Sequence, residues 1–100
     1  KIDLSNSAAI KFLQLCCDGN FGRIEELIHS VDVNLGDYDK RTPLHIAASE
    51  GHFDVVKLLV ENGAFLKEDR WGNTPLNEIE NKESEKYIEI RSYLQKINTI

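Results

Sequence analysis

The chain has 100 residues, of which 41% are hydrophobic and 29% charged, as is usual for one soluble globular domain. Its net charge of −5 argues against nucleic acid and anionic membrane surfaces as partners, because both attract a clustered excess of Lys and Arg. It contains no apolar run near the roughly 18 residues that span a bilayer, and it opens without the long apolar stretch of a secretory leader.

The first predicted pair of helices covers residues 8–17 and 21–29, where apolar residues recur at helical spacing on either side of a break at Gly19. The first of these segments contains the only cysteines, Cys16 and Cys17. A disulfide between neighbours in a helix would be strained, so we expect two reduced thiols. Reduced thiols favour the cytoplasm or another reducing intracellular compartment, and mitochondrial and nuclear locations are compatible with them.

The second predicted pair covers residues 43–50 and 53–62. Thr42 is a favourable helix cap. Pro43 suits the first helical turn, because its fixed φ angle matches the helix and its missing N–H would have had no partner there. Gly51 is expected to end the first of these helices, and Gly63, as a C′ residue with positive φ, is expected to end the second.

The third predicted pair begins with residues 75–80 and ends with a helix capped by Ser84. Its opening copies that of the second pair, since Thr-Pro-Leu occurs at residues 42–44 and again 32 residues later. Self-similarity at such a period is typical of stacked repeats. We therefore predict an all-α solenoid of about three helix-turn-helix repeats, with the polar connectors 31–41 and 64–73 projecting as β-turn fingers.

The central third of the chain supports a more specific assignment. Residues 42–48 are Thr-Pro-Leu-His-Ile-Ala-Ala, and Gly51 and Gly63 follow the two helices. This order resembles a nearly complete ankyrin repeat, a unit of about 33 residues with a Thr-Pro-Leu-His-x-Ala motif. The resemblance implies a non-catalytic solenoid that binds protein and needs no cofactor. It divides the chain into repeats at about residues 5–36, 37–68 and 69–100.

The outer repeats depart from the motif. In the third repeat Asn77 stands in the place of the histidine and Glu83 in the place of a glycine, which indicates a C-terminal cap with a polar outer face. In the first repeat the Thr-Pro opening is missing and Leu15 replaces a small residue. Two interpretations of the first repeat remain open, an N-terminal cap or a degenerate repeat that continues a longer upstream chain.

The connectors add a narrower resemblance. Residues 37–42 and 69–75 are similar to the C-terminal ankyrin segment of glutaminases, and also to segments of 60-kDa-type asparaginases and plant potassium channels. The first functional hypothesis is an independent protein-binding module. The narrower resemblance implies the alternative, an accessory or regulatory domain of a larger amide hydrolase or of an ion channel, with none of the parent protein's catalytic residues in this chain.

The repeated motif itself is predicted to be structural. In the family, the threonine and histidine of the motif hydrogen-bond to neighbouring loop backbone and hold the helix entry. His45 is therefore expected to act as a strut, that is, a side chain that links its helix to a neighbouring loop. The residues with a predicted structural role are Thr42, Pro43, Leu44, His45, Gly51, Thr74, Pro75 and Leu76.

No catalytic, cofactor or metal site is predicted. The sequence lacks a Gly-x-Ser-x-Gly elbow, a phosphate-binding glycine loop and a His-Glu-x-x-His motif. His29, His45 and His52 do not have metal-ligand spacing with one another or with the cysteines. The acidic residues between Glu78 and Glu89 are expected to form a solvated helix face with ion pairs to lysine.

The residues just before each Thr of the motif are the candidate partner-binding site, because in ankyrin proteins these positions vary and face a concave groove. Aromatic side chains and Arg dominate binding hot spots, so the single tryptophan is the sharpest candidate, the alternative being that its ring packs against the neighbouring loop. The partner is expected to be protein, either another chain or a neighbouring domain of the same chain, and not a small molecule. The candidates are Tyr38, Asp39, Arg41, Arg70, Trp71 and Asn73.

Two connector residues raise questions of their own. Phe65 stands where the family usually has a polar residue, so either a partner covers it or it fills a gap left by a repeat that is one residue short. Asn34 lies in an Asp-Val-Asn context in which ankyrin asparagines can be hydroxylated, and we expect it to hydrogen-bond a loop.

Overall fold

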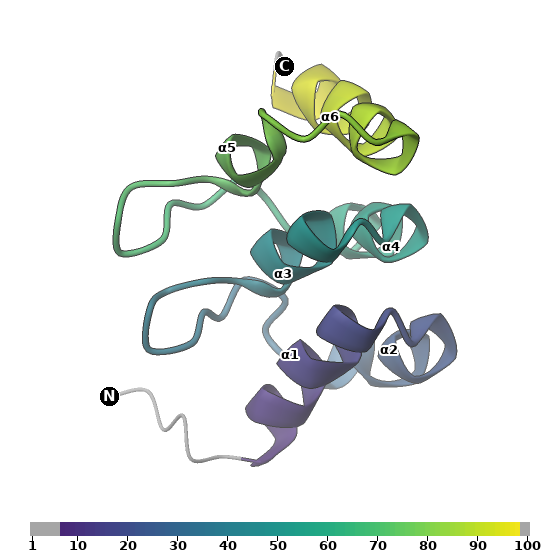
Figure 1. Cartoon of the computed structure of the whole chain (residues 1–100). Coiled ribbons are helices and arrows are strands. Elements are labelled where there is room, and N and C mark those ends of the chain that lie inside the picture. The colour runs from purple at the N-terminus through teal and green to yellow at the C-terminus, as the bar shows by residue number, and fades with distance from the viewer. Residues whose placement is uncertain (1–6, 99–100) are drawn as a thin grey trace.

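Three stacked pairs of helices make up residues 7–98, the part of the chain that the computed structural model describes (Figure 1). The pairs form three tiers, and the two long connectors between them project from the same side of the stack. This arrangement confirms the predicted all-α repeat architecture. The predicted outer repeat limits at residues 5 and 100 lie outside the described residues. The elements are α1 (Ser7–Asp18), α2 (Phe21–Leu27), the short 3₁₀ turn η1 (Ile28–Ser30), α3 (Pro43–Glu50), α4 (Phe53–Glu61), α5 (Pro75–Ile79) and α6 (Glu85–Asn98).

Local chemistry determines where α3 begins and ends. The Thr42 side-chain oxygen accepts the N–H of His45, and the His45 ring nitrogen Nδ1 accepts the N–H of Thr42 at 3.0 Å. This reciprocal capping satisfies two donors that a helix start leaves without partners. Gly51 ends the helix as predicted, and its backbone lies in the left-handed region at φ 79°. Gly63, after α4, has the predicted positive φ, at 100°.

The same capping recurs at α5 with a shorter side chain. Asn77 replaces the histidine, and its Oδ1 accepts the N–H of Thr74 at 2.9 Å. Pro75 again occupies the first turn. The predicted start of α6 is also confirmed, because the carbonyl of Ser84 accepts the first helical N–H groups of that helix, from Tyr87 and Ile88.

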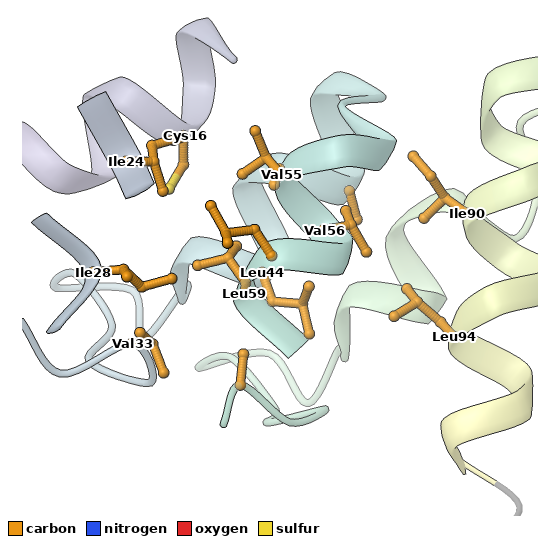
Figure 2. Close-up of a cluster of buried hydrophobic side chains, with 14 of the residues drawn as sticks. Cys16, Ile24, Ile28, Val33, Leu44, Val55, Val56, Leu59, Ile90 and Leu94 are labelled. Atoms are coloured by element: carbon orange, nitrogen blue, oxygen red, sulfur yellow. The ribbon is translucent and has the colours of Figure 1, made fainter. Parts of the chain in front are cut away.

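The core runs through all three tiers. Leu44 of α3 and Leu59 of α4 are fully buried in the middle of the stack. In Figure 2 they lie between Ile24 of the first tier and Leu94 of the third. Helix α3 packs between α1 and α5, and α4 packs between α2 and α6. Each tier therefore buries its apolar face only against its neighbours, as expected for stacked repeats.

Side chains from one tier also reach the backbone of the next. The side-chain amide of Asn34 binds the loop after α4 at two points. Its Nδ2 donates to the Gly63 carbonyl at 3.0 Å, and its Oδ1 accepts the Phe65 N–H. The loop hydrogen bond predicted for Asn34 is thus confirmed. The ring Nε2 of His52 lies 2.9 Å from the Cys17 carbonyl. Because a carbonyl oxygen can only accept, His52 donates in this contact. The tiers are thus held in register by specific polar bonds as well as by apolar packing.

The last helix closes the stack through two polar contacts. The Tyr87 hydroxyl donates to the Ser49 carbonyl near the end of α3, at 3.0 Å. The Arg91 guanidinium donates to the carbonyls of Ile79, Glu80 and Lys82, the shortest of these bonds being 2.7 Å. These carbonyls lie at and just beyond the end of α5, so Arg91 satisfies acceptors that the five-residue helix leaves free. Within residues 7–98 no helix has the length and apolar character to cross a membrane.

Candidate functional site

Two fingers project from the stack, and an aspartate carboxylate shapes each of them, half-buried in the first and buried in the second. In the first finger, residues 37–41, Asp37 Oδ1 accepts the N–H groups of Asp39 and Arg41 at 2.8 and 3.1 Å. The backbone closes the same loop, since the Asp37 N–H donates to the Arg41 carbonyl at 3.0 Å. A carboxylate that accepts two backbone donors holds the turn in one conformation.

The second finger, residues 69–73, repeats this design. Asp69 Oδ1 accepts the N–H groups of Trp71 and Asn73, both at 2.9 Å. Burial alone would raise the pKa of Asp69, but the two N–H donors, with His45 and Arg41 nearby, outweigh burial and hold that pKa below its usual range. These two aspartates were not among the predicted site residues, although each lies five residues before a motif Thr, at the common spacing of 32.

The fingers differ at one backbone position. Lys40 has φ 62° in the first finger, and Gly72, 32 residues later, has φ 82° in the second. A left-handed backbone suits glycine and strains a residue with a Cβ atom. The first finger therefore holds a strained lysine where the second has the residue that the turn favours.

The two fingers are bonded to each other. Arg70 donates its backbone N–H to the Asp39 carbonyl at 2.9 Å, and its guanidinium lies 3.1 Å from the Asp39 carboxylate. Both side chains remain more than a third exposed, so this ion pair adds little stability. The ion pair instead fixes the position of one finger against the other, so that the two fingers form one continuous surface.

Two aromatic side chains stand out on this surface. Tyr38 is 78% exposed and Trp71 is 63% exposed. The guanidinium of Arg70 lies 5.4 Å from the centre of the Trp71 ring, within the range of a cation–π contact. The ring is therefore flanked by a neighbouring cation and is not buried under the adjacent loop. Phe65 is also exposed, so it does not fill an internal gap.

Arg41 is placed differently from the other finger candidates. Its Nε and Nη2 donate to the two carboxylate oxygens of Glu78 on α5, at 3.1 and 2.8 Å, and only 30% and 17% of the two side chains are exposed. The hydrogen bonds to Glu78 raise the pKa of Arg41, with smaller contributions from the charges of Glu78 and Asp37, against a lowering by burial. The prediction that Glu78 lies on a solvated face is thus wrong, because α5 turns it toward the first finger. The rest of that acidic series, Glu80, Glu83, Glu85 and Glu89, is exposed as predicted.

His45 is buried, and it joins the second tier to the second finger. Its Nδ1 accepts the Thr42 N–H, so Nε2 carries the proton and donates to the Asn73 carbonyl at 2.8 Å. This bond confirms the predicted strut. The side chain of Asn73 itself stays exposed.

A groove of about 340 Å³ lies at the base of the first finger, between α1 and α3. Aliphatic side chains form much of its wall, and carboxylates and one arginine border it. Its lining residues are Ile10, Leu13, Gln14, Cys17, Asp37, Arg41, Ile46, Ser49 and Glu50.

The two cysteines are unpaired thiols in different surroundings. Burial raises the pKa of Cys16 to about 12, so this thiol packs in the core. The pKa of Cys17 is also raised, by burial and then by the carboxylates of Glu50 and Asp18, against a lowering by Arg41. In the described part of the chain, no three His, Cys, Asp or Glu side chains are arranged to hold a metal ion.

Comparison with known proteins agrees with the repeat architecture described above. A family model of ankyrin repeats, in three copies, matches residues 12–95. The mitochondrial liver isoform of glutaminase from Rattus norvegicus is 40% identical over 80 residues, which are 76% of this chain and 13% of the glutaminase.

Two plant proteins match a shorter stretch more closely. Potassium channel GORK of Arabidopsis thaliana is 52% identical over 60% of this chain and 8% of the channel. Serine/threonine-protein kinase VIK of the same plant is 52% identical over 58% of this chain and 14% of the kinase. The chain therefore spans no more than about a seventh of the length of these relatives.

Proposed function

The chain belongs to the ankyrin-repeat family, and from this premise we propose that it is a non-catalytic module that binds another protein through its two fingers. The observation that carries the proposal is the pair of exposed aromatic side chains, Tyr38 and Trp71, on fingers that Arg70 and Asp39 join. Exposed aromatic rings beside an arginine are typical of binding hot spots, because they bury much surface at little cost in conformational entropy.

The six candidate residues have different tasks in this proposal. Tyr38, Arg70 and Trp71 contact the partner directly, since each is exposed and combines an aromatic ring or a guanidinium with a position on the joined fingers. Asp39 orients Arg70. Arg41 and Asn73 stand at the bases of the two fingers, where Arg41 borders the groove and Asn73 offers an exposed side-chain amide.

A second candidate function follows from the relatives. They are a glutaminase, a potassium channel and a kinase, each several times longer than the region that this chain matches. In this version the fingers dock on another domain of the same polypeptide, and the module regulates or assembles a larger enzyme or channel. The binding surface is the same in both versions, and only the identity of the partner differs.

Three further properties belong to the proposal. The repeats span about residues 5–36, 37–68 and 69–100, the last being a C-terminal cap. Catalysis lies outside this chain, which is consistent with the raised pKa of both thiols, since thiolates are the nucleophilic form. The compartment is a reducing one, the cytoplasm or another intracellular space, as the unpaired cysteines favour.

The finger site is tested with proteins captured on the immobilised chain. Trp71→Ala and Tyr38→Ala are expected to reduce recovery of a specific partner at least tenfold. Truncation of a hot-spot side chain costs about 2 kcal/mol of binding free energy, and about 1.4 kcal/mol already corresponds to a tenfold loss of affinity. Ile88→Ala, which removes an exposed apolar side chain from α6, is the matched control and should leave recovery unchanged. Equal recovery by all four proteins would remove the fingers from consideration.

A further inference from the structure

The groove between α1 and α3 has features that the proposed finger contacts do not use. Its wall is aliphatic, with Ile10 49% exposed and with Leu13 and Ile46 partly buried. Its volume of about 340 Å³ falls within the roughly 300–1,000 Å³ of ligand-sized clefts. An aliphatic side chain of a partner would cover the wall and remove its apolar surface from water.

The charge around the groove is negative. Arg41 is the one cation among its lining residues, and Glu78 already neutralises it through two hydrogen bonds. Asp37 and Glu50 also line the groove, and neither makes an ion pair with any residue of the described range 7–98. Glu50 therefore presents an unpaired negative charge to an occupant, and Asp37, whose Oδ1 already accepts two backbone N–H groups, adds a second one.

The helix ends strengthen this negative potential. Asp18 is the last residue of α1 and Glu50 is the last residue of α3, 32 residues later. A helix C-terminus carries a partial negative charge, so an acidic residue there is locally unfavourable. At Asp18 a hydrogen bond from the Gln14 side chain to Oδ1, at 3.1 Å, offsets part of this cost. The pKa of Cys17, which lines the groove, is raised by burial first and then by the charges of Glu50 and Asp18, against a lowering by Arg41.

We infer that the groove receives a segment of the partner protein that combines aliphatic side chains with lysine or arginine. The aliphatic groups pack on Ile10, Leu13 and Ile46, and the cations pair with Asp37 and Glu50. The inference rests on the proposed protein-binding function and specifies the chemistry of the bound segment. An acidic segment is repelled by the same carboxylates, and a polar basic segment leaves the aliphatic wall exposed.

The test uses three labelled peptides of equal length: one of leucine and lysine, one of leucine and glutamate, and one of serine and lysine. Fluorescence anisotropy at about 0.15 M salt, where charges separated by more than about 8 Å are screened, measures each dissociation constant. The leucine–lysine peptide is expected to bind at least tenfold more tightly than either of the others. Absence of its binding, or equal binding of the leucine–glutamate peptide, overturns the inference.

Matched variants of the protein locate the bound peptide. Glu50→Lys should weaken the leucine–lysine peptide at least tenfold, and it should not unfold the protein, because a lysine suits a helix C-terminus better than a glutamate. Glu89→Lys on α6 makes the same change in net charge away from the groove and should alter binding less than twofold. Ile10→Ser should weaken binding at least fivefold, whereas Ile88→Ser, at an equally exposed isoleucine, should not. Equal effects within either pair would mean non-specific attraction and would overturn the inference.

The outcome is separable from that of the finger proposal. Trp71→Ala and Tyr38→Ala should leave the peptide's dissociation constant unchanged, because neither residue lines the groove. If the finger variants lose a protein partner and the wild type binds no peptide, the groove inference fails and the finger site stands. If the peptide binds as expected and the finger variants recover every partner, the finger site fails and the groove inference stands.

Discussion

The imidazole of His45 on α3 donates a hydrogen bond to the backbone carbonyl of Asn73 in the second finger, across 28 residues and a distance of 2.8 Å. The same ring completes the cap of its own helix through Nδ1 and Thr42. One buried side chain thus begins a helix and positions the finger of the following repeat. In the third repeat Asn77 performs only the first of these tasks.

His45→Asn separates the two tasks, because asparagine retains the cap but is too short to reach Asn73. We expect a loss of about 1–3 kcal/mol in the free energy of unfolding, the usual cost of a buried polar group left without its partner. Urea denaturation followed by circular dichroism measures this loss. Asn77→Ala at the exposed cap of α5 is the control and should cost about 0.5–2 kcal/mol. An unchanged midpoint for His45→Asn would contradict the strut.

Lys40→Gly should stabilise the protein by about 1 kcal/mol, because Lys40 has the left-handed backbone that glycine adopts without strain. Gly72→Ala at the equivalent position of the second finger should destabilise it by a similar amount. No atom lies within 4 Å of the Cβ that this change adds, so the cost is conformational and not steric. Thermal denaturation of both variants should show opposite shifts in Tm, and shifts of the same sign would refute the equivalence of the two turns.

Leu58→Ala is expected to cost about 2–5 kcal/mol in the free energy of unfolding, since it leaves a cavity in the core of the central repeat. Leu59→Ala should cost at least as much, because Leu59 is fully buried while Leu58 retains slight exposure. Chemical denaturation with Ile88→Ala as the exposed control tests the series. A denaturation midpoint for Leu58→Ala equal to that of the wild type would defeat the proposed register of the repeats.

The ion pair between Arg41 and Glu78 should stabilise the fold more than the pair between Arg23 and Glu26 on α2. The first is bidentate and mostly buried, whereas both partners of the second are mostly exposed. A double-mutant cycle to alanine is expected to give a coupling of about 1 kcal/mol or more for Arg41 and Glu78, and less than about 0.5 kcal/mol for the exposed pair. Equal coupling energies for the two pairs would show that burial does not increase the contribution of the Arg41–Glu78 pair to stability.

The two thiols should react at different rates with an alkylating reagent. Burial raises the pKa of Cys16 to about 12, and the pKa of Cys17 is also raised, so the reactive thiolate form is disfavoured at both sites. In the native protein we expect slow labelling of Cys17 and none of Cys16, and rapid labelling of both in denaturant. Mass spectrometry of the labelled peptides distinguishes the two sites. Rapid native labelling of Cys16 would mean that the first tier opens readily.

The helix limits and the stacking followed from signals that act within a few residues. Thr42 and Thr74 cap, proline occupies the first turn, and Gly51 reverses the chain, so these features depend on neighbours along the sequence and could be predicted. The candidate surface was predictable only in part. The position of Trp71 followed from its spacing to Thr74, but whether its ring was buried depended on residues of another finger.

What the sequence alone determined is the repeat: its period, its caps, its all-α class and the positions of its fingers. The tertiary structure decided the partnerships, of which the clearest are Arg41 with Glu78, 37 residues apart, and Asp39 with Arg70, 31 residues apart. The physical reason is one of range. Capping and turn formation act between neighbours along the chain, whereas the pairing of distant charges and the apolar groove between α1 and α3 exist only once the tiers have stacked.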